Sequence, residues 1–332
     1  MANPSSHRKS TQLALVCLLA GCSTANHYDN LQPVEVITPS TTDPLTHSQT
    51  HSQAAISNEQ LTEPALYSVK PSGKPKLAIA FGGGASRGVM HLGVIKALEE
   101  AGIEADIVTG TSVGSIAAAL YSSHDYQKVE QIILEFAEHE IVDFSLPTKG
   151  VIRGKALANW INSHVDFDTI EALPKTTGIV ATNLTQKKTV VFTSGDIGQA
   201  VQASSSVPGV FMPVYYQDDI IVDGGVTSLV PVYAARQLGA DIVLGIDVFC
   251  GAPPPLKYSA VHTLANAFWL QSCLVTETET HSADVVLTPK PYHPSLKHFG
   301  DLYEREQAMQ VGYQAMQAAL PELLELLGER DE

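Results

Sequence analysis

The sequence predicts an α/β fold in which helices cover both faces of a largely parallel central sheet. Apolar stretches of strand length alternate with helical patterns between residues 76 and 332, as in sheets whose parallel strands are joined by helices. Glycine-rich turns connect two of these strands to the helices that follow. The chain has 332 residues, of which 44% are apolar and 17% charged, so it can bury a substantial core.

The N-terminal 21 residues have the pattern of a secretion signal. Two basic residues precede an apolar run at 13–20, which is too short to span a bilayer as a permanent helix. The run ends in Leu-Ala-Gly before Cys22, which resembles the bacterial lipobox. The resemblance implies a lipoprotein signal peptide at 1–21 and a lipidated Cys22, and Ser23 at the next position goes with delivery to the outer membrane. A conventional secretory signal is the alternative.

Residues 22–75 have the composition of a flexible linker. The segment is rich in Ser, Thr, Gln, His, Asn and Pro and contains few side chains that could form a core. We therefore predict a lipidated linker that holds a globular domain, residues 76–332, off the membrane.

The charge of the chain restricts its partners. The formal net charge is −15, and it becomes −17 without residues 1–21, which contain two basic and no acidic residues. Nucleic acid and bare anionic membranes are poor partners for such a chain. Contact with lipid must therefore use apolar surface or an anchor.

Three cysteines remain after removal of the signal peptide, namely Cys22, Cys250 and Cys273. Outside the cytoplasm Cys250 and Cys273 could form a disulfide. There is no CxxC motif, and neither spacing indicates a metal site. We predict that both are buried free thiols and that the chain binds no metal.

The globular domain begins with a predicted strand at 76–81, followed by a glycine-rich loop at 82–88 and a helix that ends at Gly102. Backbone N–H groups in such a loop can bind an anion. A dinucleotide phosphate would require glycine at the position of Arg87. The alternative is the oxyanion of an acyl-transfer intermediate, which the next motif favours.

A Gly-Thr-Ser-Val-Gly pentapeptide centred on Ser112 lies between a predicted strand at 107–109 and a predicted helix at 115–121. The order strand, GxSxG, helix is typical of a nucleophile elbow. Gly110 and Gly114 provide the small residues that so tight a turn requires. The helix N-terminus favours negative charge beside the serine, so Ser112 is the candidate nucleophile.

The rest of the domain continues the alternation of helices and strands. Helices are predicted near 126–136, 155–165, 197–206, 260–282 and 302–327, the last one interrupted near Pro321. Strands are predicted near 178–183, 188–193, 220–222, 241–248 and 284–288.

The predicted strand at 220–222 leads into Asp223, which two glycines follow. An aspartate before glycine is often only a turn former. A nucleophilic serine, however, needs a base that accepts its proton, and a carboxylate within hydrogen-bond reach can do so. Asp223 is therefore the candidate base for Ser112.

These motifs together resemble those of the patatin-like phospholipase family. Its GGGxxRG, GxSxG and DGG motifs stand in the family's order at 82–88, 110–114 and 223–225, and its proline block is similar to 203–211. The resemblance is strong over residues 76–250. It implies a patatin-like layered fold for a catalytic domain at 76–332 and a Ser112–Asp223 dyad without any cofactor.

The resemblance also assigns roles to the neighbouring residues. Backbone N–H groups of Gly82, Gly83 and Gly84 would bind the oxyanion, and Arg87 would position that loop or a phosphate. Four further glycines would support the two turns: Gly110, Gly114, Gly224 and Gly225. In one departure from the family, which often has Asn shortly after DGG, Thr227 and Ser228 stand beyond the motif, and this puts the local support of Asp223 in question.

The favoured function is a serine acyl hydrolase for lipid esters, such as a phospholipase A, a lysophospholipase or an esterase, with membrane lipids as substrate. An α/β-hydrolase with a Ser-Asp-His triad would instead use one of four histidines: His262, His281, His293 or His298. A membrane-anchored scaffold would keep the fold without turnover. Calcium dependence is not predicted, because no carboxylate cluster resembles a calcium-binding loop.

Overall fold

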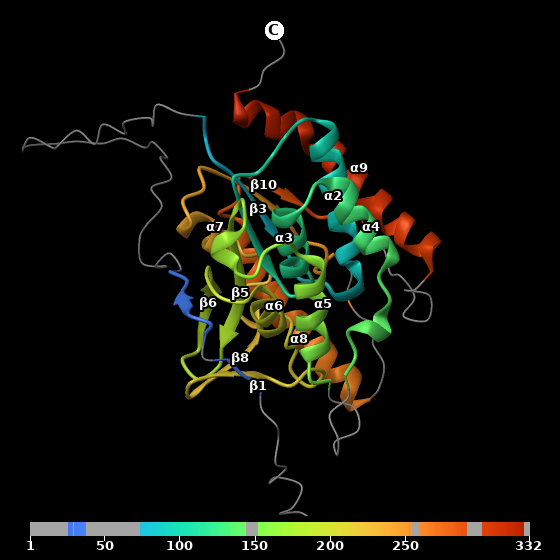
Figure 1. The fold of residues 1–332 in the computed structure, drawn as a ribbon. Coiled ribbons are helices and arrows are strands. Elements are labelled where there is room, and N and C mark those ends of the chain that lie inside the picture. The colour runs from blue at the N-terminus through green and yellow to red at the C-terminus, as the bar shows by residue number, and fades with distance from the viewer. Residues whose placement is uncertain are drawn as a thin grey trace, which may run out of the picture.

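The computed structural model describes residues 26–28, 30–37, 74–143, 152–251, 253, 259–290 and 301–328. These residues form one ten-stranded sheet with helices on both sides (Figure 1). The fold class predicted from the sequence is confirmed. The signal peptide, Cys22 and most of the predicted linker lie outside the described residues.

The centre of the sheet is parallel, as predicted. Its strands, in spatial order, are β5 (Thr176–Asn183), β4 (Ile107–Thr111), β3 (Leu77–Phe81), β9 (Ile242–Ile246) and β10 (Val285–Leu287). β3, β4 and β9 are buried along their whole length, which explains why they are continuous apolar runs in the sequence. Their carboxyl ends meet at one edge of the sheet, where the motifs lie.

The remaining strands extend this sheet beyond β5. β8 (Asp219–Asp223) and β6 (Lys188–Phe192) both pair antiparallel with β5. β7 (Val214–Tyr216) pairs with β8. The sheet is therefore mixed, and β8 brings its last residue beside the end of the parallel strands.

The helices cover the two faces unequally. The larger layer contains α2 (Val89–Glu100), α3 (Val113–Ser123), α4 (Tyr126–Glu135), α5 (Lys155–His164), α6 (Ile197–Ser204) and α9 (Leu302–Leu327). The other face carries α7 (Val232–Gln237) and α8 (Ala260–Thr280). None of the helices within the described ranges combines the length and apolarity that crossing a membrane would require.

Helices α2 and α9 pack closely through two glycines. A Cβ added at Gly93 would lie 1.9 Å from the carbonyl oxygen of Met309, and one at Gly312 would lie 1.9 Å from that of Met90. The predicted interruption of α9 near Pro321 is wrong, because the helix continues through that residue to Leu327. Tertiary packing overrides the local cost of a proline in a helix.

The N-terminal segment differs from the predicted linker. β1 (Asn26–His27) pairs parallel with β7, and β2 (Pro33–Glu35) pairs antiparallel with β6. Leu31 and Val36 are buried against the domain. Residues 26–37 are therefore part of the sheet, and the predicted linker, placed at 22–75, is wrong for this stretch.

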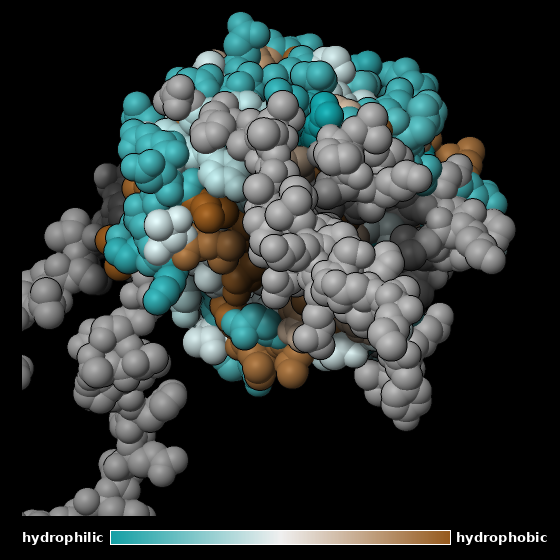
Figure 2. Space-filling view, turned by 90° about the horizontal axis from the view of Figure 1, so that it is seen from below, coloured by the Kyte–Doolittle hydropathy of each residue, from teal (hydrophilic) through white to brown (hydrophobic). Residues whose placement is uncertain are grey.

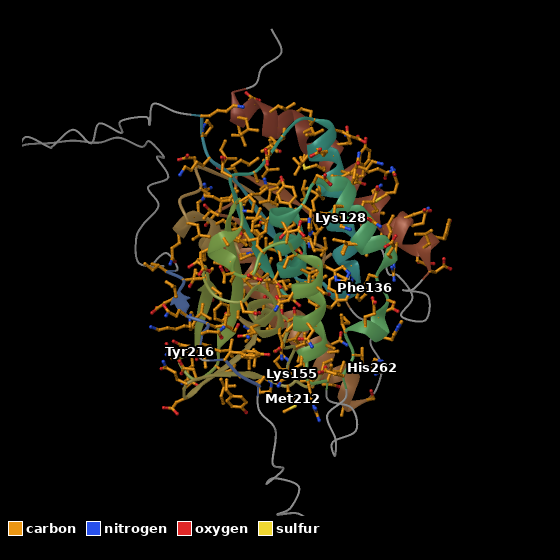
Figure 3. The ribbon with its side chains drawn as sticks, viewed as in Figure 1. Lys128, Phe136, Lys155, Met212, Tyr216 and His262 are labelled. Atoms are coloured by element: carbon orange, nitrogen blue, oxygen red, sulfur yellow. A yellow bond between two sulfur atoms is a disulfide. The ribbon has the colours of Figure 1, made fainter. Side chains whose placement is uncertain are left out.

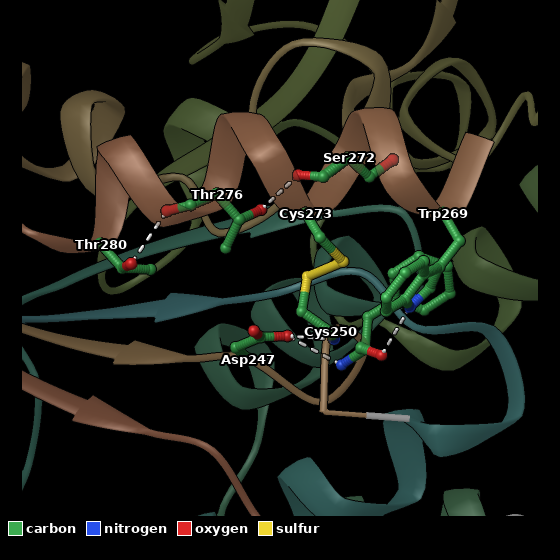
Figure 4. The surroundings of a disulfide bond; sticks show 8 residues. Asp247, Cys250, Trp269, Ser272, Cys273, Thr276 and Thr280 are labelled. Carbon is green, nitrogen blue, oxygen red and sulfur yellow. Dashed lines mark hydrogen bonds between the residues drawn. A yellow bond between two sulfur atoms is a disulfide. The ribbon is translucent and has the colours of Figure 1, made fainter. Parts of the chain in front are cut away.

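The prediction of two free thiols is also wrong, because Cys250 and Cys273 form a disulfide with a Cα–Cα distance of 5.4 Å. Cys250 follows β9, and Cys273 lies on α8 (Figure 4). In the same place the indole N–H of Trp269 donates to the carbonyl of Phe249, 3.3 Å away. These two links fasten α8 to the loop after β9.

Candidate active site

Ser112 lies on a strained turn between β4 and α3. Its backbone has φ 54° and ψ −127°, a left-handed conformation that costs a residue with a side chain of order 1–3 kcal/mol. The N–H of Ser112 donates to Oγ of Ser204 at 2.9 Å, and its carbonyl accepts from Oγ of Ser115 at 2.6 Å. The turn is thus held from two sides in the geometry of a nucleophile elbow.

The two glycines of the pentapeptide are required by close backbone contacts. A Cβ on Gly114 would lie 2.0 Å from the carbonyl oxygen of Phe81, and one on Gly110 would lie 2.2 Å from that of Gly114. Both distances are far below van der Waals contact, so β3, β4 and the start of α3 can meet only through glycine. This contact fixes Ser112 relative to the glycine-rich loop that follows β3.

Asp223 is the last residue of β8 and is almost fully buried, with 1% of its surface exposed. The pairing of β8 with β5 places it opposite Ala181, while Thr111 pairs with Val180 of β5. Its Oδ1 accepts the N–H of Gly225 at 2.7 Å. Its Oδ2 is buried and accepts no well-aligned hydrogen bond from the described residues.

Burial raises the pKa of Asp223 to about 6. The hydroxyl of Ser112 and the N–H of Gly225 both interact with the carboxylate and oppose this rise. The structure therefore brings Ser112 and Asp223 together, although they are far apart in the chain. A carboxylate with this pKa is ionised at neutral pH and is a stronger proton acceptor than an exposed aspartate.

The segment after Asp223 has support that the sequence did not reveal. Oγ1 of Thr227 lies 2.9 Å from Oγ1 of Thr182 and 2.8 Å from Oγ1 of Thr189. The carbonyl of Ser228 accepts from Oγ1 of Thr111 at 2.8 Å. Threonine hydroxyls from β4, β5 and β6 thus hold the segment in which Thr227 and Ser228 depart from the family pattern.

The glycine-rich loop supplies fewer free donors than predicted. The N–H of Gly82 donates to the carbonyl of Ile246, and that of Gly83 donates to the carbonyl of Leu229, both at 3.0 Å. Within the described residues, the N–H of Gly84 has no backbone acceptor. The prediction that all three N–H groups face the oxyanion is therefore wrong for Gly82 and Gly83, and Gly84 remains the candidate donor.

Arg87 lies beside this loop with its guanidinium over the ring of Phe249, 5.2 Å from the ring centre. Burial lowers the pKa of Arg87, and nearby Asp247 opposes this change. Oδ1 of Asp247 in turn accepts the N–H groups of Phe249 and Cys250. Arg87 therefore connects the glycine-rich loop to the loop that carries the disulfide, which fits the positioning role predicted for it.

His91 is a supporting residue that the sequence analysis missed. It is buried on α2, and its Nε2 lies 2.8 Å from the carbonyl oxygen of Gly82. Burial lowers its pKa to about 4, so the ring is neutral at pH 7 and donates to this carbonyl. Its position one helical turn after Arg87, beside the glycine-rich loop, was the available signal.

An apolar cavity of ≈ 80 Å³ is lined in part by Val113, the residue after Ser112. It lies between α2, α3, α4 and α5, and its wall includes Val113, Ile116, Leu120, Phe136 and Trp160. Phe136 is labelled in Figure 3. A space of this size and polarity suits hydrocarbon better than water, which needs polar partners.

Two of the four histidines proposed for a catalytic triad, His262 and His281, lie in the described part of the chain. Among the described residues, the groups that interact with the carboxylate of Asp223 include no histidine. Nδ1 of His262 lies 2.6 Å from Oγ of Ser259 at the start of α8, and His281 is exposed at the other end of that helix. His293 and His298 lie outside the described residues.

A serine on a strained turn from strand to helix, next to a buried carboxylate, is an arrangement typical of serine hydrolases. Residues 79–236 match the model of the family described as patatin-like phospholipase. The fold is similar to that of VipD from Legionella pneumophila, with a TM-score of 0.50 and 14% identity over 75% of this chain and 67% of that chain.

The chain is also similar to curated proteins. An uncharacterized NTE family protein of Mycobacterium tuberculosis is 28% identical over 210 residues, which are 62% of this chain and 58% of the relative. Lysophospholipase NTE1 of Coccidioides immitis is 32% identical over 184 residues, 52% of this chain and 11% of the relative. These matches span little more than half of the mycobacterial relative and about a tenth of the fungal one.

Proposed function

We propose that the protein is a serine acyl hydrolase that cleaves carboxyl esters of lipids through a dyad of Ser112 and Asp223. The observation that carries this proposal is the position of the two residues. Ser112 is held on a strained elbow, and a buried Asp223 faces it with one oxygen, Oδ2, not yet bonded to a well-aligned donor. An orphaned carboxylate oxygen of this kind is ready to accept the serine proton.

In the proposed reaction Oγ of Ser112 attacks the ester carbonyl carbon while its proton moves to Oδ2 of Asp223. The carbonyl oxygen becomes an oxyanion, which the N–H of Gly84 and the N-terminus of α3 stabilise. The intermediate collapses, and the alcohol leaves with the proton held by Asp223. Asp223, which gave its proton to the departing alcohol, takes a proton from the water that attacks the acyl-enzyme. It passes this proton to Oγ of Ser112 as the acyl bond breaks, which releases the fatty acid and the free serine.

The lipid class of the substrate is supported by the apolar cavity and by the relatives. The cavity provides an almost entirely apolar wall beside the nucleophile, where an acyl chain can leave water at a gain of about 0.8 kcal/mol per methylene. The matching family is one of phospholipases, and one relative is a lysophospholipase. We infer that the first few carbons of the acyl chain of a phospholipid or lysophospholipid occupy this cavity.

We further propose that Cys22 carries a lipid that anchors the protein in the bacterial outer membrane. Support comes from the lipobox pattern at the end of the signal sequence. A disulfide within the described domain agrees with folding outside the cytoplasm. An enzyme anchored in this way has its lipid substrate close by.

The proposal is tested by labelling the purified protein with a fluorophosphonate. Wild type should be labelled, Ser112→Ala should not, and Asp223→Asn should react at least about a hundredfold more slowly, because the serine loses its base. Ser163→Ala, at an exposed serine on α5, is the matched control and should label normally. A folded wild type that stays unlabelled would favour the scaffold alternative, and full labelling of Asp223→Asn would exclude the dyad.

Substrate class is tested with the same variants on vesicles of phosphatidylcholine and on micelles of lysophosphatidylcholine. Release of fatty acid should depend on Ser112, and among soluble esters the rate should rise with acyl length because the cavity is apolar. Hydrolysis confined to short-chain soluble esters would contradict a lipid substrate.

A further inference from the structure

Helix α8 exposes an apolar face to solvent. Leu264, Leu270 and Leu274 are 58%, 53% and 57% exposed, and Ala267 between them is exposed as well. Their spacing places these four residues on one side of the helix. Single exposed leucines are ordinary, but several on one side of a helix form a candidate surface for contact with lipid or another molecule. We call these four residues the α8 apolar face.

The α8 apolar face continues onto a neighbouring loop. A Cβ at Gly209 would lie 3.3 Å from Cδ2 of Leu264, so this loop contacts the first leucine of the face. The next residue, Val210, is 44% exposed. Seen from below, apolar residues gather on this side of the surface, next to hydrophilic ones (Figure 2).

The same loop leads to the strand that holds the N-terminal segment. Val214 starts β7 and pairs with Asn26 of β1, and Met212, just before it, lies at the same end of the molecule as β1 (Figures 1 and 3). Cys22 precedes Asn26 by four residues. Because an extended chain spans at most about 3.6 Å per residue, a lipid on Cys22 lies within about 14 Å of β1.

The turn after Asp223 packs against the same helix. Phe268 lies one turn beyond Leu264 on α8, and its ring would be 3.5 Å from a Cβ at Gly225. Gly225 is the residue whose N–H binds Asp223. The α8 apolar face, the end of the chain next to Cys22 and the turn after Asp223 therefore occupy neighbouring positions.

We propose that the α8 apolar face, together with Val210, rests on the lipid bilayer to which Cys22 is anchored. This inference depends on the proposed anchor and deepens the proposed function, because it brings membrane lipid next to Asp223. Since the chain is strongly acidic, contact depends on burial of apolar side chains and not on attraction to anionic lipid. The short connection to β1 holds the domain on the membrane surface.

The test uses the mature chain, residues 22–332, produced without the signal peptide so that Cys22 stays unmodified. All variants carry Ser112→Ala, so that binding is measured without hydrolysis and does not depend on whether the protein is an enzyme. Partition onto phosphatidylcholine vesicles is measured by sedimentation. Leu264→Gln with Leu270→Gln should lower the partition coefficient at least about tenfold, because two leucines no longer enter lipid.

The matched control replaces two leucines of similar exposure on α9, Leu302→Gln with Leu326→Gln, which are 51% and 41% exposed. The control variant should bind vesicles as the parent chain does. Raising the salt concentration should not weaken the vesicle binding of either protein. Equal binding by the α8 variant and the parent, an equal loss in the control, or binding only to anionic vesicles at low salt would each overturn the proposal.

A second copy of the chain is the alternative occupant of this face. Sedimentation velocity without vesicles should show a monomer for the parent chain and for the α8 variant. A dimer of the parent that the two α8 substitutions dissociate would show that the face is a subunit contact, and the proposal would then be wrong.

Discussion

Two regions of this molecule are built in different ways. The motif core consists of the turns after β3, β4 and β8, which bear Gly84, Ser112 and Asp223, and it is sealed by backbone contacts too close for any side chain. The peripheral layer consists of β1, β2 and α8, and it is attached by a few bonds between residues far apart in the chain. The motif core is thus held by tight backbone contacts, whereas the peripheral layer is attached by strand pairing and a disulfide between residues far apart in the chain.

The largest expected effect is in the motif core. Gly114→Ala should destabilise the fold by more than about 4 kcal/mol, because its Cβ would lie 2.0 Å from a backbone oxygen that cannot move away. Gly102→Ala is the control, since nothing lies within 4 Å of its Cβ and only the positive φ costs about 1 kcal/mol. Urea unfolding measures both. A loss below 1 kcal/mol for Gly114→Ala would show that the elbow can relax.

Removal of the disulfide tests how much it contributes to the attachment of the peripheral layer. Replacing Cys250 and Cys273 by serine opens a loop with a sequence separation of 23 and should cost about 3 kcal/mol. Thermal unfolding should show a Tm lower by on the order of 10 °C. Labelling of Ser112 by a fluorophosphonate should stay within about threefold of wild type, and its abolition would show that α8 belongs to the motif core.

The raised pKa of Asp223 predicts that this residue lowers the stability of the fold in a pH-dependent way. The folded state holds this proton more tightly than the unfolded state, so the stabilising contribution is fully present below pH 3.8 and is lost as pH rises through about 6. Asp223→Asn should therefore be more stable than wild type by about 1–3 kcal/mol at pH 8, and the difference should vanish near pH 4. Asp218→Asn, at an exposed carboxylate, should show neither effect.

The same pKa sets the acid limb of activity. Labelling of wild type should decline as pH falls through about 6, because protonated Asp223 cannot accept the proton of Ser112. A rate that is unchanged down to pH 4 would show that another group is the base.

The smallest effect concerns the N-terminal segment. The hydroxyl of Tyr28 donates to Oε1 of Gln202 at 2.5 Å, so Tyr28→Phe should cost about 1 kcal/mol and leave labelling unchanged. Tyr303→Phe, at a residue 63% exposed on α9, should cost nothing measurable. A large loss of labelling in Tyr28→Phe would show that the geometry of the motif core depends on β1.

The motif core could be predicted because its signals are local. Each turn combines a buried apolar strand, small residues and the start of a helix within about ten positions, and the parallel arrangement then brings the strand ends to one edge. The positions of Ser112 and Asp223 followed from these patterns. The hydrogen bonds of the N–H groups of Gly82 and Gly83 could not be predicted, because their acceptors, Ile246 and Leu229, are more than 140 residues away.

The helix of the peripheral layer was predicted near 260–282, but the attachment of this layer was not, because nothing local marks it. Two-residue and three-residue strands such as β1 and β2 are too short to show a period of two, and their surroundings have the composition of a linker. The pairing of Cys250 with Cys273 likewise depends on where α8 packs. Glu279 illustrates the same limit: burial on α8 raises its pKa to about 7, and its carboxylate accepts the N–H of Tyr233, 2.9 Å away.

The pairing of β1 with β7 also dictates an order of assembly. Asn26 lies close to the proposed lipidation site, yet its partner Val214 follows 188 positions later. If the chain is exported as proposed, the N-terminal strand stays unpaired until β7 and β8 have left the translocation channel. Pairings of such long range form late in folding. If Cys22 is already anchored in the membrane at that time, the late pairing of β1 with β7 places the folded sheet next to the bilayer.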